Sequence, residues 1–413
     1  MLRFVNLKLG LVLLPALFIV ATPLADSERF VASLPQFRNW GLENKINNNS
    51  HIHAPEAWKH TEGSHDIIVA VIDTGIDPNH PDLKNNLWRD LKTRFYGWDF
   101  VANKPNPQDD HGHGTHVAGI LGANLNLKAG VSGVAHKVSI MAVKYYSEKN
   151  TGTQNLENSI KALNWAIDHG AKIINYSGGG PEFSGSEFQA IKRAREKNIL
   201  IVAAAGNERH NSDLVENYYY PCSYRLDNII CVSATNIRNE MLPSSNWGKN
   251  HVDFAAPGEG ILSTVPNGKY AYMSGTSQAT AFVSGLASLM LAKDRTLKPA
   301  QIREILRSSV DKLPSLEGKV FTGGKVNAAK ALATVSNLST ARATALDRPA
   351  RATALDRPAH ATALDRTARA TTLDSTARAT TLDSTARATT LDTHTLSGTQ
   401  KTIKTDSLKK KKI

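Results

Sequence analysis

Cysteine is scarce in this chain: Cys222 and Cys231 are the only two among 413 residues. No CxxC pair with the spacing of a structural metal site is present, which excludes a cysteine-rich metal domain. The two cysteines flank a short turn. In an exported protein this arrangement favours a local disulfide, and two buried free thiols are the alternative.

Long hydrophobic runs are missing as well. The apolar stretch at residues 9–21 follows Arg3 and Lys8 and is interrupted by Gly10 and Pro15. It is too short to cross a bilayer, and a positive start before such a run is typical of a cleavable secretion signal. We expect a signal peptide over 1–25, an extracellular or periplasmic location, and no stable membrane span after cleavage, with an uncleaved anchor as the alternative.

Aromatic residues make up only 7% of the chain, while 41% apolar residues are enough for one sizeable core. The formal net charge is +12, but the stretch from Ala341 onward contributes +7 of it. The body of the chain is therefore only mildly basic, and a nucleic acid is not an expected partner.

A nine-residue unit repeats six times from Ala341, drifting from ARATALDRP to ARATTLDST. One leucine and a few alanines per unit do not supply the continuous apolar face of a solenoid. We expect a flexible low-complexity tail over 336–413 with a basic end at 409–412. It would follow a short extension over 26–39 and a folded domain over 40–335.

Strand-like and helix-like segments alternate in the folded part. Residues 67–72 form an uninterrupted β-branched run, and further apolar strands are expected at 138–143, 173–176, 199–204 and 229–233, with helices at 115–121, 156–168 and 185–196. This alternation predicts an α/β fold of three layers around a doubly wound, mostly parallel sheet. Functional sites of such sheets lie at the carboxyl ends of the strands, where Asp73, Ser177 and Asn207 occur.

Ser277 lies in a small-residue turn, 275–281, that leads into an apolar helix at 282–291. A serine at the start of a helix is firmly held near the positive end of the dipole, which suits a nucleophile, although such a turn is also an ordinary helix cap. His113 stands between Gly112 and Gly114 before another helix and is a candidate general base.

Four blocks of the chain, at 71–77, 111–119, 205–207 and 275–277, resemble those of the subtilisin-like serine proteases over roughly residues 40–332. The resemblance implies a serine endopeptidase that needs no cofactor for its chemistry. Asp73 would orient His113, His113 would take the proton of Ser277, and Asn207 would donate to the oxyanion. A zinc site built from His111, His113 and His116 is the rival, but the usual spacing with an intervening glutamate is missing.

The same resemblance implies how a substrate binds. Ser177, Gly178 and Gly179 would form one wall of the primary side-chain pocket. Gly152 and Thr153 would form an edge that pairs with an extended polypeptide substrate. Glu208 would lie at the pocket rim, either favouring a basic residue or simply solvated. We expect broad specificity and a monomer.

The resemblance further allows a structural calcium ion, with Asp82 as a ligand and the loop 122–130 nearby, although Leu127 replaces an expected ligating asparagine. Members of the family usually carry a folded propeptide. Only about fifteen residues separate Ala25 from Trp40 here, too few for a domain with its own core. We therefore expect either unaided folding or a separate polypeptide that acts as folding helper or inhibitor.

Two further departures lie beside the nucleophile, where Gln278 and Ala281 replace a methionine and a proline of the family pattern. Ala281 restores a backbone N–H that can bond to the carbonyl of Ser277 and so shift the start of the helix. A peptide ligase or transpeptidase that uses the same residues is therefore an alternative function. A catalytically silent secreted binding protein is the alternative from another class.

Overall fold

The structure is a computed structural model that describes residues 39–47, 49–124 and 130–346. The predicted signal peptide, nearly all of the short extension and most of the repeat tail lie outside these residues. Within the described part, no helix is long and apolar enough to cross a membrane.

A ten-stranded sheet runs through the described domain in the order β11-β12-β8-β7-β6-β5-β1-β4-β2-β3. Its pairs are parallel except β11 with β12 and β2 with β3 at the two ends. The strands are β1 (Gly63–Asp73), β2 (Gly97–Asp99), β3 (Lys104–Pro105), β4 (Lys137–Lys144), β5 (Ile173–Tyr176), β6 (Leu200–Ala204), β7 (Ile229–Thr235), β8 (Phe254–Pro257), β11 (Asp311–Lys312) and β12 (Gly324–Lys325). A separate hairpin joins β9 (Ile261–Val265) to β10 (Lys269–Met273).

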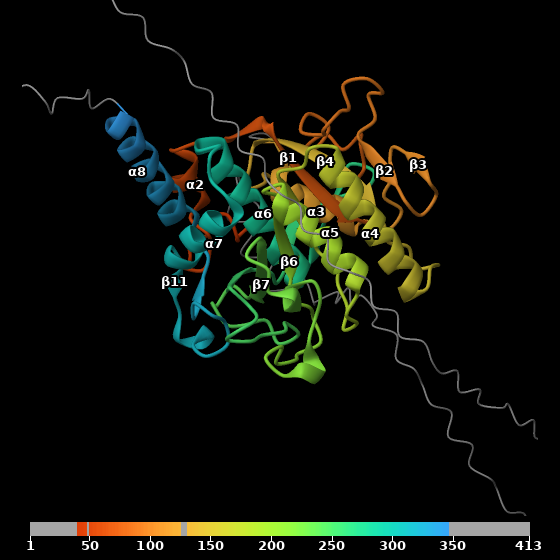
Figure 1. The fold of residues 1–413 in the computed structure, drawn as a ribbon. Helices are drawn as coiled ribbons and strands as arrows, with labels where there is room; N and C mark the ends of the chain where they lie inside the picture. Colours follow the sequence, from red (N-terminus) through yellow and green to blue (C-terminus); the bar gives the residue numbers. More distant parts are fainter. Residues whose placement is uncertain (1–38, 48, 125–129, 347–413) are drawn as a thin grey trace, which may run out of the picture. The chain divides into compact units, whose positions relative to one another are not determined.

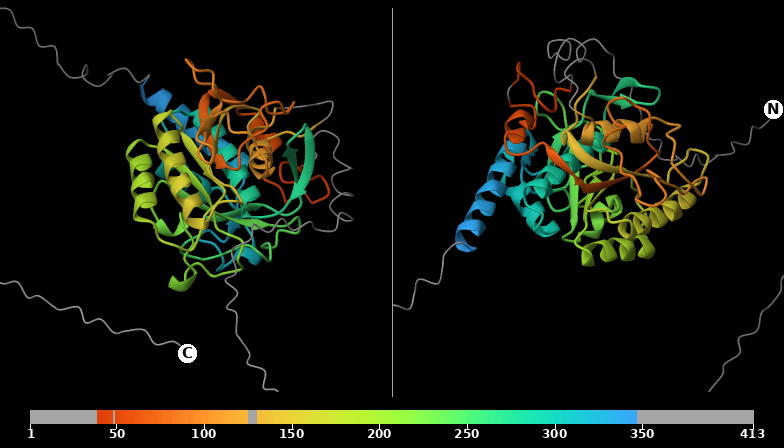
Figure 2. Two further views of the ribbon diagram at one scale, coloured as in Figure 1. Left: turned by 90° about the vertical axis from the view of Figure 1, so that its right-hand side faces the viewer. Right: turned by 90° about the horizontal axis from the view of Figure 1, so that it is seen from above.

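Helices cover both faces of this sheet (Figures 1 and 2). Helices α4 and α5 lie together on one face, and α3 and α6 pack on the other. The helices are α2 (Ala54–Trp58), α3 (His113–Gly122), α4 (Gly152–Asp168), α5 (Gly185–Glu196), α6 (Thr276–Lys293), α7 (Pro299–Ser308) and α8 (Ala328–Leu346). The predicted three-layer α/β class with a mostly parallel sheet is confirmed.

The position of β1 between two layers of helices explains the unbroken apolar run in its sequence. Val69 and Val71 face the layer that contains α6, whereas Ala70 and Ile72 face the layer that contains α4. Because both faces are covered, successive side chains are buried in opposite cores, and no polar alternation remains.

Helix α6 is the central helix of the domain. Its residues from Thr276 to Leu291 are all buried, as expected of a helix that is enclosed on every side. It packs against β1, β5, β6 and β7. Its amino end therefore places Ser277 at the edge of the sheet where Asp73, Ser177 and Asn207 follow their strands.

Helix α8 continues to Leu346, so the predicted domain boundary at 335 falls inside a helix. Val335 is fully buried in the core, and Nη1 of Arg342 donates to Oδ2 of Asp294 over 2.6 Å. Alanine is a strong helix former, so the alanine-rich start of the repeats continues the last helix. The bond between Arg342 and Asp294 attaches this extension to the domain.

The interior of α6 offers a stability test with a matched surface control. Leu286 is fully buried and Leu91 is 89% exposed. We expect Leu286→Ala to lower the free energy of unfolding by about 3 kcal/mol, because the lost contacts leave a cavity. Leu91→Ala should change it by less than about 0.5 kcal/mol. Urea denaturation of both variants measures the difference. An equal loss of unfolding free energy in the two variants would contradict the burial of α6 in the core.

Candidate active site

Asp73 and His113 form a buried pair at the carboxyl edge of the sheet. Asp73 is the last residue of β1, and His113 is the first residue of α3. The imidazole Nδ1 lies 2.8 Å from Oδ1 and 3.0 Å from Oδ2 of Asp73. The backbone N–H of Thr74 also donates to Oδ1, over 2.7 Å. These bonds hold the ring with Nδ1 toward the carboxylate and leave Nε2 for chemistry.

Gly114 lets these two segments approach each other. A Cβ atom at this position would lie 2.2 Å from the carbonyl oxygen of Gly75 and 3.2 Å from Cβ of Asp73. A side chain larger than hydrogen would therefore separate α3 from the end of β1. The glycines on either side of His113 are required by this close packing and by the positive φ of Gly112.

A second carboxylate, Asp109, organises the loop before His113. Its Oδ1 accepts from Oγ1 of Thr74 over 2.8 Å and from the N–H of Gly112 over 2.8 Å. Its Oδ2 accepts from the N–H and the hydroxyl of Thr115, over 2.9 Å and 2.5 Å. Asp109 therefore fixes the start of α3 relative to β1. The sequence reasoning missed it because a lone aspartate in a polar loop carries no motif.

Opposing effects act on the imidazole of His113. Burial lowers its pKa, whereas the charge and hydrogen bond of Asp73 and the more distant charge of Asp109 raise it. The net effect is a raised pKa. The two carboxylates thus favour the imidazolium, which is the form that a general base adopts after it has accepted a proton.

Ser277 is the second residue of α6 and is 4% exposed. Its hydroxyl donates to the carbonyl oxygen of Ser177 over 2.9 Å, and Oγ of Ser177 donates to the carbonyl oxygen of Ser277 over 3.2 Å. Among the described residues no hydrogen bond joins Ser277 to His113. The hydroxyl is bonded to Ser177 in this structure, and that bond must be given up before His113 can take the serine proton.

Asn175 supports this arrangement from inside β5. Its Nδ2 donates to Oγ of Ser177 over 2.8 Å, and its Oδ1 accepts from Oγ of Ser284 over 2.8 Å. A buried polar chain thus ties β5 to α6 behind the nucleophile. The sequence reasoning missed Asn175 because it treated the residue as part of an apolar strand.

Asn207 lies beside the amino end of α6, just after β6. Its Oδ1 accepts from the backbone N–H of Thr276 over 3.0 Å, which leaves its Nδ2 as a donor next to Ser277. Asn246 holds this loop: its Oδ1 accepts from the N–H of Glu208, and its Nδ2 donates to the carbonyl oxygen of Ala205. The arrangement provides an amide donor at a fixed position near the serine.

A buried aspartate–histidine pair, a serine at a helix start and an amide donor can together carry out acyl transfer. The family profile described as "Subtilase family" matches residues 64–347 of the chain. This protein belongs to the subtilase family.

Curated relatives agree with this assignment. Thermitase of Thermoactinomyces vulgaris is 38% identical over 281 residues, which cover 68% of this chain and 93% of that protein. Subtilisin E of Bacillus subtilis (strain 168) is 38% identical over 277 residues, or 67% of this chain and 68% of that one. The major intracellular serine protease of the same strain is 38% identical over 239 residues, 58% and 72% of the two chains. The subtilase is therefore a serine-type endopeptidase, and the predicted Asp-His-Ser class of enzyme is confirmed.

The predicted extended edge at Gly152 and Thr153 is wrong, because both residues lie in the first turn of α4. Thr151 caps this helix: its hydroxyl accepts from the N–H of Gln154 over 3.2 Å, and its own N–H donates to Oε1 of Gln154 over 2.8 Å. This reciprocal capping box stabilises a helical start.

The other predicted substrate residues belong to the two segments that contact the start of α6 through Ser177 and Asn207. Ser177 contacts Ser277 directly, and Gly178 and Gly179 continue from it. Glu208 follows Asn207, and its Oε2 accepts from Nδ2 of Asn246 over 2.6 Å. Burial of the carboxylate raises the pKa of Glu208.

The three histidines of the zinc alternative have separate partners and do not form one metal site. Nε2 of His111 faces Glu148 at 3.3 Å, and Nε2 of His116 lies 3.0 Å from the carbonyl oxygens of Ile261 and Ala271. Burial, followed by the charge of His113, lowers the pKa of His116 to about 3. The described residues contain no group of three or more His, Cys, Asp or Glu that could hold a metal ion.

Asp82, the predicted calcium ligand, already has protein donors. Its Oδ2 accepts from the backbone N–H of Val131 over 3.0 Å and from the hydroxyl of Tyr270 over 2.8 Å. Residues 125–129, which include Leu127, lie outside the described part of the chain. Asp82 supplies a carboxylate to the predicted site, whereas a calcium ion takes several oxygen ligands.

The raised pKa of His113 predicts the pH dependence of the first chemical step. Only the neutral imidazole can accept the serine proton, so the rate should rise with pH through an inflection above 6.5, the ordinary histidine value. The rate of labelling by a fluorophosphonate, measured against pH, reports this inflection, with Ser277→Ala as the unlabelled control. An inflection below the ordinary histidine value would contradict the effect of the two carboxylates.

Proposed function

We propose that Ser277 attacks the peptide carbonyl after His113 has accepted its proton, with Asp73 holding the imidazole and stabilising its charged form. The acyl-enzyme then forms on Oγ of Ser277, and His113 returns the proton to the leaving amine. The observation that carries this assignment is the 2.8 Å contact between Nδ1 of His113 and Asp73, at the same edge of the sheet as Ser277.

The oxyanion of the tetrahedral intermediate would lie between Nδ2 of Asn207 and the backbone N–H of Ser277. Oδ1 of Asn207 is fixed by the N–H of Thr276, so the donor is oriented before the substrate arrives. A donor that is already oriented loses no reorganisation energy during the reaction, which is why such groups stabilise the transition state strongly.

The substrate is an unfolded polypeptide bound in extended conformation, with Ser177, Gly178 and Gly179 on one side of the reacting residue and Glu208 on the other. Main-chain recognition gives affinity without a demand on most side chains, which supports broad specificity along the bound segment. The enzyme acts as a monomer in this scheme. None of the proposed steps requires a metal or a cofactor.

The protein is exported, with residues 1–25 removed as a signal peptide, and works outside the cytoplasm. The charged start and the short apolar run support this location. A separate polypeptide that acts as folding helper or inhibitor belongs to the same proposal, with unaided folding as the alternative. A calcium ion at Asp82 would stabilise the structure and take no part in the reaction.

Covalent labelling combined with proteolysis tests the proposed nucleophile. The purified protein should react with a fluorophosphonate probe and hydrolyse an unfolded protein such as reduced casein, and both activities should be lost in Ser277→Ala. A catalytically silent binding protein would show neither activity. Labelling that persists in Ser277→Ala would exclude this serine as the nucleophile.

Removal of the oxyanion donor should affect turnover more than binding. We expect Asn207→Ala to lower kcat by about 10²–10³ with little change in KM, an effect of the size known for this donor in subtilisin and not one derived from this structure. Asn49→Ala, a surface control, should leave both constants unchanged. Steady-state kinetics on a peptide anilide measures both, and a change in KM alone would assign Asn207 to substrate binding.

Ala281 allows the ligase alternative to be measured in the same assay. Ala281 lies within α6, four residues after Ser277, where its N–H is in position for the carbonyl of Ser277. With an amino-acid amide added, the wild type should give more transpeptidation product than Ala281→Pro does. Equal yields from the two would show that Ala281 does not favour transpeptidation over hydrolysis.

A further inference from the structure

Two loops contact the start of α6 next to the nucleophile. The segment 177–179 follows β5 and touches Ser277 through the carbonyl oxygen of Ser177. The segment 206–208 follows β6 and touches the start of α6 through Asn207. In the proposed acyl-enzyme, the side chain on the acyl side of the cut would enter the gap between these two loops.

The ring of Tyr219 occupies this gap. A Cβ atom built on Gly179 would lie 2.5 Å from Cε1 of Tyr219, and a Cβ atom built on Gly206 would lie 3.0 Å from Cε2. Cε1 and Cε2 are on opposite edges of the ring. The ring therefore spans the distance between the two glycine backbones, and neither glycine could carry a side chain without displacing it.

Several contacts hold Tyr219 in this position. Its N–H donates to Oγ of Ser223 over 3.0 Å. The next residue, Tyr220, pairs with Gly180 through two backbone hydrogen bonds of 2.8 Å and 3.1 Å. The loop behind Tyr219 is thus attached to the same segment that forms the pocket wall.

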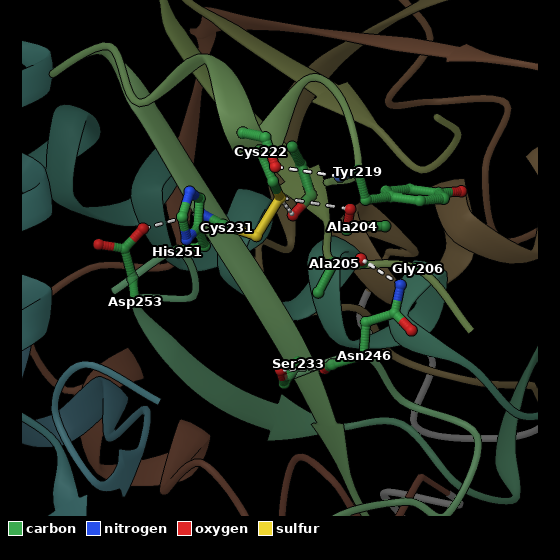
Figure 3. Close-up of a disulfide and its surroundings, with 12 residues drawn as sticks. Ala204, Ala205, Gly206, Tyr219, Cys222, Cys231, Ser233, Asn246, His251 and Asp253 are labelled. Carbon is green, nitrogen blue, oxygen red and sulfur yellow. Dashed lines mark hydrogen bonds between the residues drawn. A yellow bond between two sulfur atoms is a disulfide. The ribbon is translucent and has the colours of Figure 1, made fainter. Parts of the chain in front are cut away.

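A disulfide closes this loop against the sheet. Cys222, three residues after Tyr219, is joined to Cys231 of β7 with sulfurs 2.05 Å apart. Figure 3 shows the ring of Tyr219 directed away from the disulfide. Tyr219 and Gly206 lie on the same side of the disulfide in this view. The tyrosine ring therefore extends into the gap from a loop that the disulfide ties to β7.

We propose that Tyr219 closes the primary side-chain pocket, so that the enzyme cleaves after small residues such as glycine, alanine and serine and rejects large apolar ones. This inference rests on the proposed function, because the gap is a substrate pocket only if Ser277 is the nucleophile. It restricts one substrate position and leaves main-chain recognition of the other positions unchanged.

Glu208 does not supply a competing preference for a basic residue. Its carboxylate is bonded to Nδ2 of Asn246 over 2.6 Å and lies beside Gly206, where a Cβ atom would be 2.5 Å from Oε2. The carboxylate of Glu208 and the ring of Tyr219 therefore both lie next to Gly206. The carboxylate is already engaged with Asn246 and is not a free partner for a basic side chain.

Peptide anilides that differ only in the residue before the cut test the pocket. For the wild type, kcat/KM should be at least about 100-fold higher with alanine than with phenylalanine, since a single extra or missing methylene already changes discrimination by about 10–200-fold. Tyr219→Gly should raise kcat/KM for phenylalanine at least about tenfold and change the alanine value by less than about threefold. Tyr219→Phe should keep the wild-type preference.

Tyr218→Gly is the matched control, because it removes the neighbouring tyrosine ring and loosens the backbone equally. Its preference for alanine should equal that of the wild type, and a shift as large as that of Tyr219→Gly would overturn the assignment. All rates are expressed per site labelled by a fluorophosphonate, so unfolded protein does not enter them.

The wild-type profile decides the inference even if a variant fails to fold. Labelling of Ser277 together with a preference for phenylalanine or leucine would overturn the closed pocket and leave the proposed function standing. Failure of Ser277 to label would overturn the proposed function itself. Labelling with a preference for small residues that disappears in Tyr219→Gly would support both.

Discussion

The buried contact between Asp73 and His113 is the interaction on which the rest of the site depends. Because the two residues lie 40 positions apart in the sequence, their contact requires β1 and α3 to end and begin at one edge of the sheet. Parallel strands provide such an edge, since their carboxyl ends lie side by side. Asp109 then fixes the loop between the two elements through Thr74, Gly112 and Thr115.

The nucleophile is positioned by a different part of the fold. Helix α6 passes behind the sheet and presents Ser277 at the same edge, while Asn175 and Ser177 hold its first turn to β5. In this arrangement the hydroxyl of Ser277 donates a hydrogen bond to the carbonyl oxygen of Ser177. Before His113 can take the serine proton, the hydroxyl must exchange that bond for one to the imidazole.

Much of the fold was predictable because long apolar strands alternate with helices, and the four motif blocks identified the residues around the nucleophile. The shorter elements were not, since β8, β11, β12 and the β9–β10 hairpin have too few residues to show a period. The edge expected at Gly152 failed for a local reason, the capping box of Thr151 and Gln154, which could have been found in the sequence. Residues such as Asp109, Asn246 and Tyr219 act through tertiary contacts alone, and no spacing in the chain reveals those.

The central claim is that Asp73 fixes the imidazole of His113 with its proton on Nδ1 and its lone pair on Nε2. Nuclear magnetic resonance of protein with ¹⁵N-labelled histidine, recorded above the pH at which His113 titrates, observes the two nitrogens separately. The account predicts a protonated Nδ1 with a strongly downfield proton resonance that is lost in Asp73→Ala. A proton found on Nε2 instead would contradict it.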